Sequence, residues 1–246
     1  MDLQEIFAEE RFPNVVVALD GTVVATWGAK HLAVRRSEDG GSTWGPAIDV
    51  GEGIHAGGSM VDEGTGDLLF FGHPEHPAKD SSMAPRTIYR STDAGRTWHG
   101  EEPAFDEDGL GHVPSLHFSE VGTTLRQGAH AGRLLRPARV YVEGAGYNMA
   151  VFSDDHGKTW HASTPFPVDG TGEGCVTELD DGRIYYSSRQ HRFAEGETLR
   201  HERLHAWSRD GGATWTDAAH SSLPDGPAYR GEEGRGANYN GHFGMA

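Results

Sequence analysis

A glutamate and an arginine lie sixteen residues apart on either side of a short turn, and this spacing could bring them together. Two runs of strand-forming residues, 175–179 and 183–188, flank the turn at 180–182. Antiparallel pairing about that turn sets Glu173 opposite Arg189, within a register error of one residue. A carboxylate can serve as a general base, and a guanidinium can bind an anionic ligand through two parallel hydrogen bonds. The pair therefore indicates acid–base or anion-binding chemistry at the open end of a hairpin.

Other candidates fall at the same rim. Arg11 stands at the open end of the first hairpin, nine residues before the turn at Asp20, and His31 and His55 lie near this rim in the first two repeats. Each has an ordinary alternative, because a strand-end arginine is usually solvated or paired, and Glu173 could be a plain loop acid. Because two arginines and one glutamate are expected at the same rim, we interpret this rim as a candidate ligand-binding or catalytic site. No H-x-H or H-x-x-x-H pair falls on one predicted strand, so no metal site is expected.

The elements that must position these residues are indicated by a repeated eight-residue motif, S-x-D-x-G-x-T-W. In such an Asp-box, the Ser and Asp side chains accept bonds from neighbouring amides, Gly takes a positive φ, and Trp packs between sheets. Each copy predicts a hairpin turn, and the box residues themselves are expected to be structural. The four copies are at residues 37–44, 91–98, 153–160 and 208–215.

The spacing of the boxes predicts the fold. Their aspartates, at positions 39, 93, 155 and 210, are 54, 62 and 55 residues apart, which is close to the length of a four-stranded propeller blade. We therefore expect an all-β protein, with residues 1–246 forming a single β-propeller domain of about four blades. A propeller with more blades than this would be incomplete in the chain as written.

The amino-acid composition argues against some classes of binding partner. The net charge of −16 argues against nucleic acid and against an anionic membrane surface, so an anionic ligand would need a local cationic pocket. Cys175 is the single cysteine, which excludes an intrachain disulfide. The first residues lack the pattern of a signal peptide, so the chain as written is expected to be cytoplasmic. No cofactor is expected, and the oligomeric state stays open.

These motifs resemble the sialidase (neuraminidase) superfamily of six-bladed Asp-box propellers, and most closely the bacterial exo-sialidase-like proteins with BNR repeats. Arg11-Phe12-Pro13 is similar to the family's Arg-Ile-Pro motif, and the segment from Gly172-Glu173 to Ser188-Arg189 is similar to the segment that carries the catalytic glutamate. The resemblance implies that Arg11 and Arg189 bind the carboxylate of a terminal sialic acid. It also implies that Glu173 is the base that takes the proton of a tyrosine nucleophile.

The chain departs from the family pattern in one loop. The resemblance implies a catalytic aspartate after the first hairpin, whereas residues 28–31 here read Gly-Ala-Lys-His and contain no carboxylate. His31 or His55 could take its place, and the third arginine and the tyrosine would lie beyond residue 246. The expected function is exo-α-sialidase-like hydrolysis of a terminal sialic acid or a related acidic sugar. The alternatives are a glycan-binding propeller without catalysis and a scaffold built from Asp-box blades.

Overall fold

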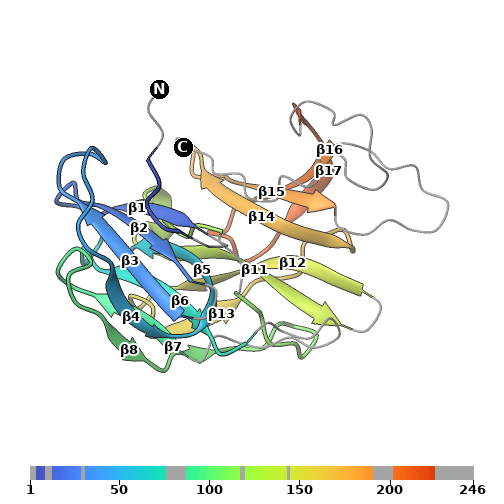
Figure 1. Ribbon diagram of the computed structural model, residues 1–246. Helices are drawn as coiled ribbons and strands as arrows, with labels where there is room; N and C mark the ends of the chain where they lie inside the picture. Colours follow the sequence, from blue (N-terminus) through green and yellow to red (C-terminus); the bar gives the residue numbers. More distant parts are fainter. Residues whose placement is uncertain are drawn as a thin grey trace, which may run out of the picture.

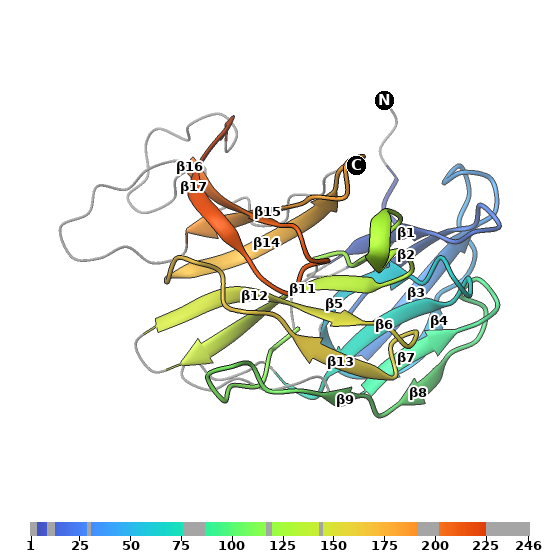
Figure 2. The ribbon, with the colours of Figure 1, turned by 180° about the vertical axis from the view of Figure 1, so that it is seen from behind.

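The computed structural model describes residues 4–8, 13–28, 31–75, 87–116, 120–142, 145–190 and 202–224. Within these ranges the regular elements are β-strands, apart from one 3₁₀ turn at Gly128–His130. No helix there is long and apolar enough to cross a membrane. Four sheets follow one another around an arc in the order of the sequence (Figure 1, and from behind in Figure 2). The predicted all-β propeller of Asp-box blades is confirmed.

Each sheet is a blade in which consecutive strands pair side by side and antiparallel. Blade one contains β1 (Asn14–Val17), β2 (Val23–Trp27), β3 (His31–Ser37) and β4 (Ile48–Glu52), and blade two contains β5 (Ile54–Val61), β6 (Leu68–His73), β7 (Thr87–Ser91) and β8 (His99–Glu101). Blade three contains β10 (Thr123–Thr124), β11 (Leu134–Val142), β12 (Ala145–Ser153) and β13 (Thr159–Ala162), and blade four contains β14 (Thr171–Glu178), β15 (Ile184–Gln190), β16 (Glu202–Ser208) and β17 (Thr216–Pro224).

Blade three has one strand more than expected. The short strand β9 (Ala104–Phe105) follows blade two in the sequence but pairs with β13 in parallel. The connection between the two blades therefore closes the outer edge of blade three. Covering an edge strand in this way removes unpaired backbone groups from the surface.

The four Asp-boxes have the predicted geometry. In the third box, Ser153 Oγ accepts the Gly157 amide at 2.8 Å, and Asp155 Oδ2 accepts the Thr159 hydroxyl at 2.7 Å. The corresponding bonds in the other three boxes measure 2.8–2.9 Å and 2.6 Å. Gly157 takes the expected positive φ of 82°, and the residue before it, His156, is also left-handed at 61°. The bonds to Ser and Asp stabilise a turn that needs two successive residues in this region.

The hydrophobic core lies between consecutive blades. Three clusters of buried residues join blade one to two, two to three, and three to four. Three of the box tryptophans take part as expected: Trp160, for example, is 1% exposed and meets Phe71 of blade two edge-on, with ring centroids 5.5 Å apart. Trp44 of the first box is only partly buried. Trp215 packs on Tyr186 within blade four.

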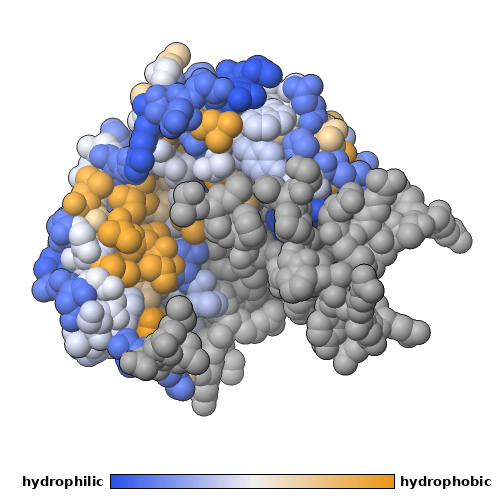
Figure 3. Space-filling view, turned by 90° about the horizontal axis from the view of Figure 1, so that it is seen from above, coloured by the Kyte–Doolittle hydropathy of each residue, from blue (hydrophilic) through white to orange (hydrophobic). Residues whose placement is uncertain are grey.

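Blade one buries the face of β1 that points toward blade two and exposes the other. Val16 is buried, whereas Val15 and Val17 are more than half exposed. Figure 3 shows hydrophobic residues gathered on this side of the molecule. The alternation follows from the period of two along a β-strand.

A polar contact also joins each blade to the next. In each case an arginine of one blade donates to the backbone carbonyl of the fourth residue, or its neighbour, in the Asp-box of the following blade. The fourth residue of each box is left-handed. The pairs are Arg36 Nε with Ala94 O at 2.7 Å, Arg90 Nη2 with His156 O at 2.8 Å, and Arg133 Nη1 with Gly211 O at 3.2 Å.

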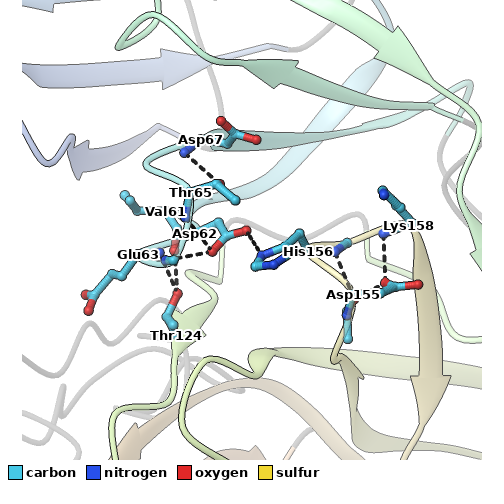
Figure 4. Close-up of polar contacts among 12 residues, drawn as sticks. Val61, Asp62, Glu63, Thr65, Asp67, Thr124, Asp155, His156 and Lys158 are labelled. Carbon is cyan, nitrogen blue, oxygen red and sulfur yellow. Dashed lines mark hydrogen bonds and ion pairs between the residues drawn. The ribbon is translucent and has the colours of Figure 1, made fainter.

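The junction of blades two and three has a second polar link, shown in Figure 4. Asp62, fully buried after β5, accepts the Gly64 amide at 2.9 Å and lies 2.8 Å from Nδ1 of His156 in the third box. The Thr124 hydroxyl donates to Val61 O at 2.8 Å. The turn between β5 and β6 is therefore bonded to both the inner strand and the Asp-box of blade three.

Candidate active site

Glu173 lies in an irregular part of strand β14. Gly174 pairs with Ser188 and Thr171 pairs with Gln190, so β14 has one extra residue between these two pairs. A bulge of this kind bends the strand and changes the direction in which its side chains point. The predicted juxtaposition of Glu173 and Arg189 holds, although a bulge and not a regular pair produces it.

The two side chains form an ion pair. Arg189 Nη1 lies 2.7 Å from Glu173 Oε2, and the side chains are 15% and 16% exposed. A charge-assisted hydrogen bond at this distance is strong and directional. The carboxylate therefore fixes the guanidinium at the end of the β14–β15 hairpin, with part of each group open to solvent.

A second arginine fixes the backbone of Glu173. Arg203, on β16, is 3% exposed and donates through Nη2 to the Glu173 carbonyl at 3.2 Å. Its Nε donates to Ser187 Oγ at 2.8 Å. Glu173 is thus bonded from its own hairpin through its side chain and from the next strand through its carbonyl.

Blade three contributes two more buried arginines. Arg139 donates to the Tyr141 hydroxyl at 2.9 Å and reaches the Thr171 carbonyl of blade four at 3.5 Å. Arg136 is fully buried, donates to Leu116 O at 3.1 Å, and stands 4.4 Å from the ring centre of Phe71. Burial lowers the pKa of Arg136 to about 10, in spite of the attraction of Glu120, so it stays charged at neutral pH.

Glu120 is the second acid at this junction. It is 6% exposed, and its Oε1 accepts the Gly174 amide at 3.2 Å. Burial raises the pKa of Glu120 to about 8, and the repulsion of Glu173 adds to the rise, whereas Arg136 opposes it. A carboxyl group with such a pKa is mostly protonated at neutral pH.

The junction of blades three and four is therefore a local concentration of positive charge in an acidic protein of net charge −16. Such a cluster suits an anionic ligand, because guanidinium groups stay charged and bind carboxylates in a fixed geometry. Among the described residues no group of three His, Cys, Asp or Glu side chains could bind a metal ion. The cluster consists of Arg136, Arg139, Arg189, Arg203, Glu120 and Glu173.

The other candidates from the sequence are placed differently. His31 belongs to β3 of blade one, and its Nε2 lies 2.5 Å from Asp49 Oδ1, with the imidazole half exposed. Asp49, on the neighbouring strand β4, thus places a carboxylate beside His31. His55 lies in β5, but its side chain is outside the described residues, and so is Arg11.

Four members of this cluster were not predicted from the sequence: Arg136, Arg139, Arg203 and Glu120. One signal was available, since Arg136 and Arg139 interrupt an apolar run at 134–140 that predicts a buried strand. A charged residue in such a run is rarely buried without a partner.

The comparisons with known proteins agree with this geometry. The model of the BNR repeat-like domain matches residues 28–228. The chain belongs to the BNR repeat-like family. It is 31% identical over 217 residues to a sialidase of Micromonospora viridifaciens, and the match covers 76% of this chain and 33% of that protein. The resemblance to sialidases inferred from the motifs is confirmed.

Solved structures share the fold of this BNR-repeat chain. The Hadza microbial sialidase Hz136 superposes with a TM-score of 0.66 at 22% identity, over 85% of this chain and 46% of that one. The intramolecular trans-sialidase of Ruminococcus gnavus, in complex with oseltamivir carboxylate, gives 0.63 at 15% identity, over 87% and 71%. The chain spans about a third of the length of the Micromonospora sialidase.

Proposed function

We propose that this chain carries the carboxylate-binding part of a sialidase-type site and acts as an exo-α-sialidase-like glycoside hydrolase on terminal sialic acid or a related acidic sugar. The observation that supports this most directly is the ion pair of Arg189 and Glu173 within a cluster of arginines. Similarity to sialidases supplies the reaction class. The partners are then sialoglycans.

The chemistry assigns one role to each member of the pair. Arg189 has five N–H donors in a planar fork, so it can bond Glu173 and a ligand carboxylate at the same time. Sialidases use a tyrosine nucleophile, since a carboxylate would be repelled by the substrate's own anion. Glu173 is the base that accepts the phenolic proton in this scheme, and Arg189 bonds its carboxylate at 2.7 Å.

The test compares two substitutions in the protein that contains this chain, with a fluorogenic α-sialoside and a matched neutral galactoside as ligands. Glu173→Gln should lower kcat at least about 100-fold while sialoside affinity is kept. Arg189→Ala should weaken sialoside binding at least about 10-fold, because it removes a charge-assisted bond to the ligand. Arg183→Ala is the control, because Arg183 directly precedes β15 and is paired with Asp181. Equal sialoside affinity in the two arginine variants would contradict the proposal.

A glycan-binding propeller without turnover is the second candidate. The loop at 28–31 favours it, because it has no carboxylate where the resemblance implies the catalytic acid. A protein of this kind would bind the sialoside through Arg189 without hydrolysing it. Glu173→Gln would then leave affinity nearly unchanged and there would be no turnover to lose.

A further inference from the structure

The single peptide group that joins Glu173 to Gly174 in the bulge is held at its carbonyl and at its amide by side chains from different parts of the fold. The Glu173 carbonyl accepts Arg203 of β16, and the next amide, that of Gly174, donates to Glu120. Glu120 precedes β10 and belongs to the neighbouring blade. Since a bulge disrupts the regular ladder, contacts of this kind decide how the extra residue is oriented.

Gly174 has no room for a side chain. A Cβ atom there would lie 2.5 Å from the Tyr186 ring, 3.0 Å from Asn148 Nδ2 and 3.0 Å from the Ser187 carbonyl. Tyr186 is itself fully buried, and its hydroxyl donates to Met149 O at 2.9 Å. The backbone of the bulge is therefore packed closely against β15 and against Asn148 of blade three, and the Gly174 amide donates to the Glu120 carboxyl.

The burial of Glu120 lowers the stability of the folded protein. Its carboxyl group is buried, and Oε2 has no hydrogen-bond partner among the residues that the structure describes. Three charged groups face it: Arg136 and Arg139 from β11, and Glu173 from β14. A buried carboxyl that leaves one oxygen without a bond destabilises the folded protein, so its place beside a candidate catalytic residue points to function.

We propose that Glu120 is a positioning residue for Glu173: it fixes the Gly174 amide and thereby the bulge that turns the Glu173 carboxylate toward Arg189. The catalytic part of this inference rests on the function proposed above. The structural part stands without it. Glu120 itself needs no contact with the sugar to act in this way.

The first measurement is amide hydrogen exchange at Gly174, resolved to single residues. Glu120→Met removes the acceptor at similar volume and should raise the exchange rate at Gly174 at least about 10-fold, whereas Glu120→Gln keeps an acceptor oxygen and should leave it near the wild-type rate. Glu178→Met is the control. Glu178 lies on β14, as Gly174 does, but its carboxylate accepts the amides of Arg126 and Gln127 and not that of Gly174. Unchanged exchange in Glu120→Met would overturn the inference.

The second measurement separates positioning from simple support of the fold. With a fluorogenic sialoside, Glu120→Met should lower kcat about 10-fold to 100-fold with KM within about 3-fold, and Glu120→Gln should restore most of it. Faster exchange without a fall in kcat would contradict the catalytic part. If Glu120→Met does not fold, Glu120→Asp takes its place, since the shorter acid cannot reach Gly174.

The two measurements also distinguish failure of the proposed function from failure of the inference about Glu120. A wild-type protein that neither binds nor hydrolyses sialosides would end the proposed function. The exchange rates at Gly174 would still decide whether Glu120 fixes the bulge.

Discussion

Glu173 Oε2 and Arg189 Nη1 lie 2.7 Å apart across strands β14 and β15, and about 85% of each side chain is buried. Because both charges have lost most of their water, removing one partner leaves the other poorly compensated. We expect Arg189→Ala to lower the free energy of unfolding by about 3 kcal/mol in urea titrations at neutral pH. Arg189→Lys should lower the free energy of unfolding by less, since lysine keeps the positive charge.

The control for this prediction is an exposed pair of the same type. Arg96 Nη2 lies 2.9 Å from Glu38 Oε1, with side chains 51% and 64% exposed. Arg96→Ala should cost less than about 1 kcal/mol, because water screens exposed ion pairs. Similar losses in the two variants would show that the burial of the Glu173 pair adds no stability.

The Asp-boxes predict a loss of stability in acid. The bonds that Asp39 accepts from the Thr43 hydroxyl and amide lower its pKa to about 2. Burial raises the pKa of Asp155, but the bonds from Thr159 and Ser153 outweigh it and again leave about 2. Both values lie below the unfolded value of about 3.9, so this stabilisation is complete above about pH 4 and is lost as the pH falls toward 2.

The melting temperature should therefore fall steeply between about pH 4 and pH 2. Asp155→Asn cannot titrate, so its melting temperature should start lower at neutral pH and depend less on pH across this window. Parallel curves for the wild type and the variant would refute the assignment to the box.

The contact between blades gives a matched pair of substitutions. Arg133 is bonded to Asp154 and to the Gly211 carbonyl of the next blade, and its guanidinium stands 4.2 Å from the Phe152 ring centre. Arg183 has the equivalent place in blade four, where it stands 4.9 Å from the Trp207 ring centre and is bonded to Asp181.

Arg133→Met should cost about 2 kcal/mol of unfolding free energy, because it leaves a carbonyl between blades without its donor. Arg183→Met should cost less than about 1 kcal/mol, since that side chain is partly exposed. Equal costs, measured by chemical denaturation, would mean that the bond to the next blade contributes nothing.

Cys175 reports on access to the site. It lies two residues from Glu173, is 7% exposed, and burial raises the pKa of its thiol to about 11. Because the thiolate is the reactive form, a disulfide reagent at about pH 8 should label the native protein at least about 100-fold more slowly than the protein in urea. Rapid labelling of the folded protein would contradict the close packing of β14 against blade three.

The Asp-box turns could be predicted because their bonds are local. Ser153, Asp155 and Thr159 fall within seven residues, so the sequence alone contains every partner. The pairing of Glu173 and Arg189 could also be predicted, since it depends only on the register about one turn. The bulge at Glu173 could not, because Glu120 and Arg203, which bond the backbone there, come from distant parts of the sequence.

The buried arginines show the same limit. Arg136 lies over Phe71 of blade two, and Arg139 reaches Thr171 of blade four, so the reason for their burial lies in neighbouring sheets. An alternating pattern predicts which face of a strand is covered, but not which polar groups meet there. For this reason the part of the site contributed by blade three appeared only in the structure.

The arginine contact between blades gives the arc a direction. In each of the three arginine contacts described, the donor is on the earlier blade and the acceptor carbonyl is on the later one, as in Arg36 with Ala94 and Arg90 with His156. The two sides of a blade are therefore not interchangeable, and a blade inserted in reverse would place donor against donor. Head-to-tail contacts of this kind close into a ring only when the rotation per unit divides a full turn. The number of blades in a closed ring is then set by the angle between neighbouring sheets.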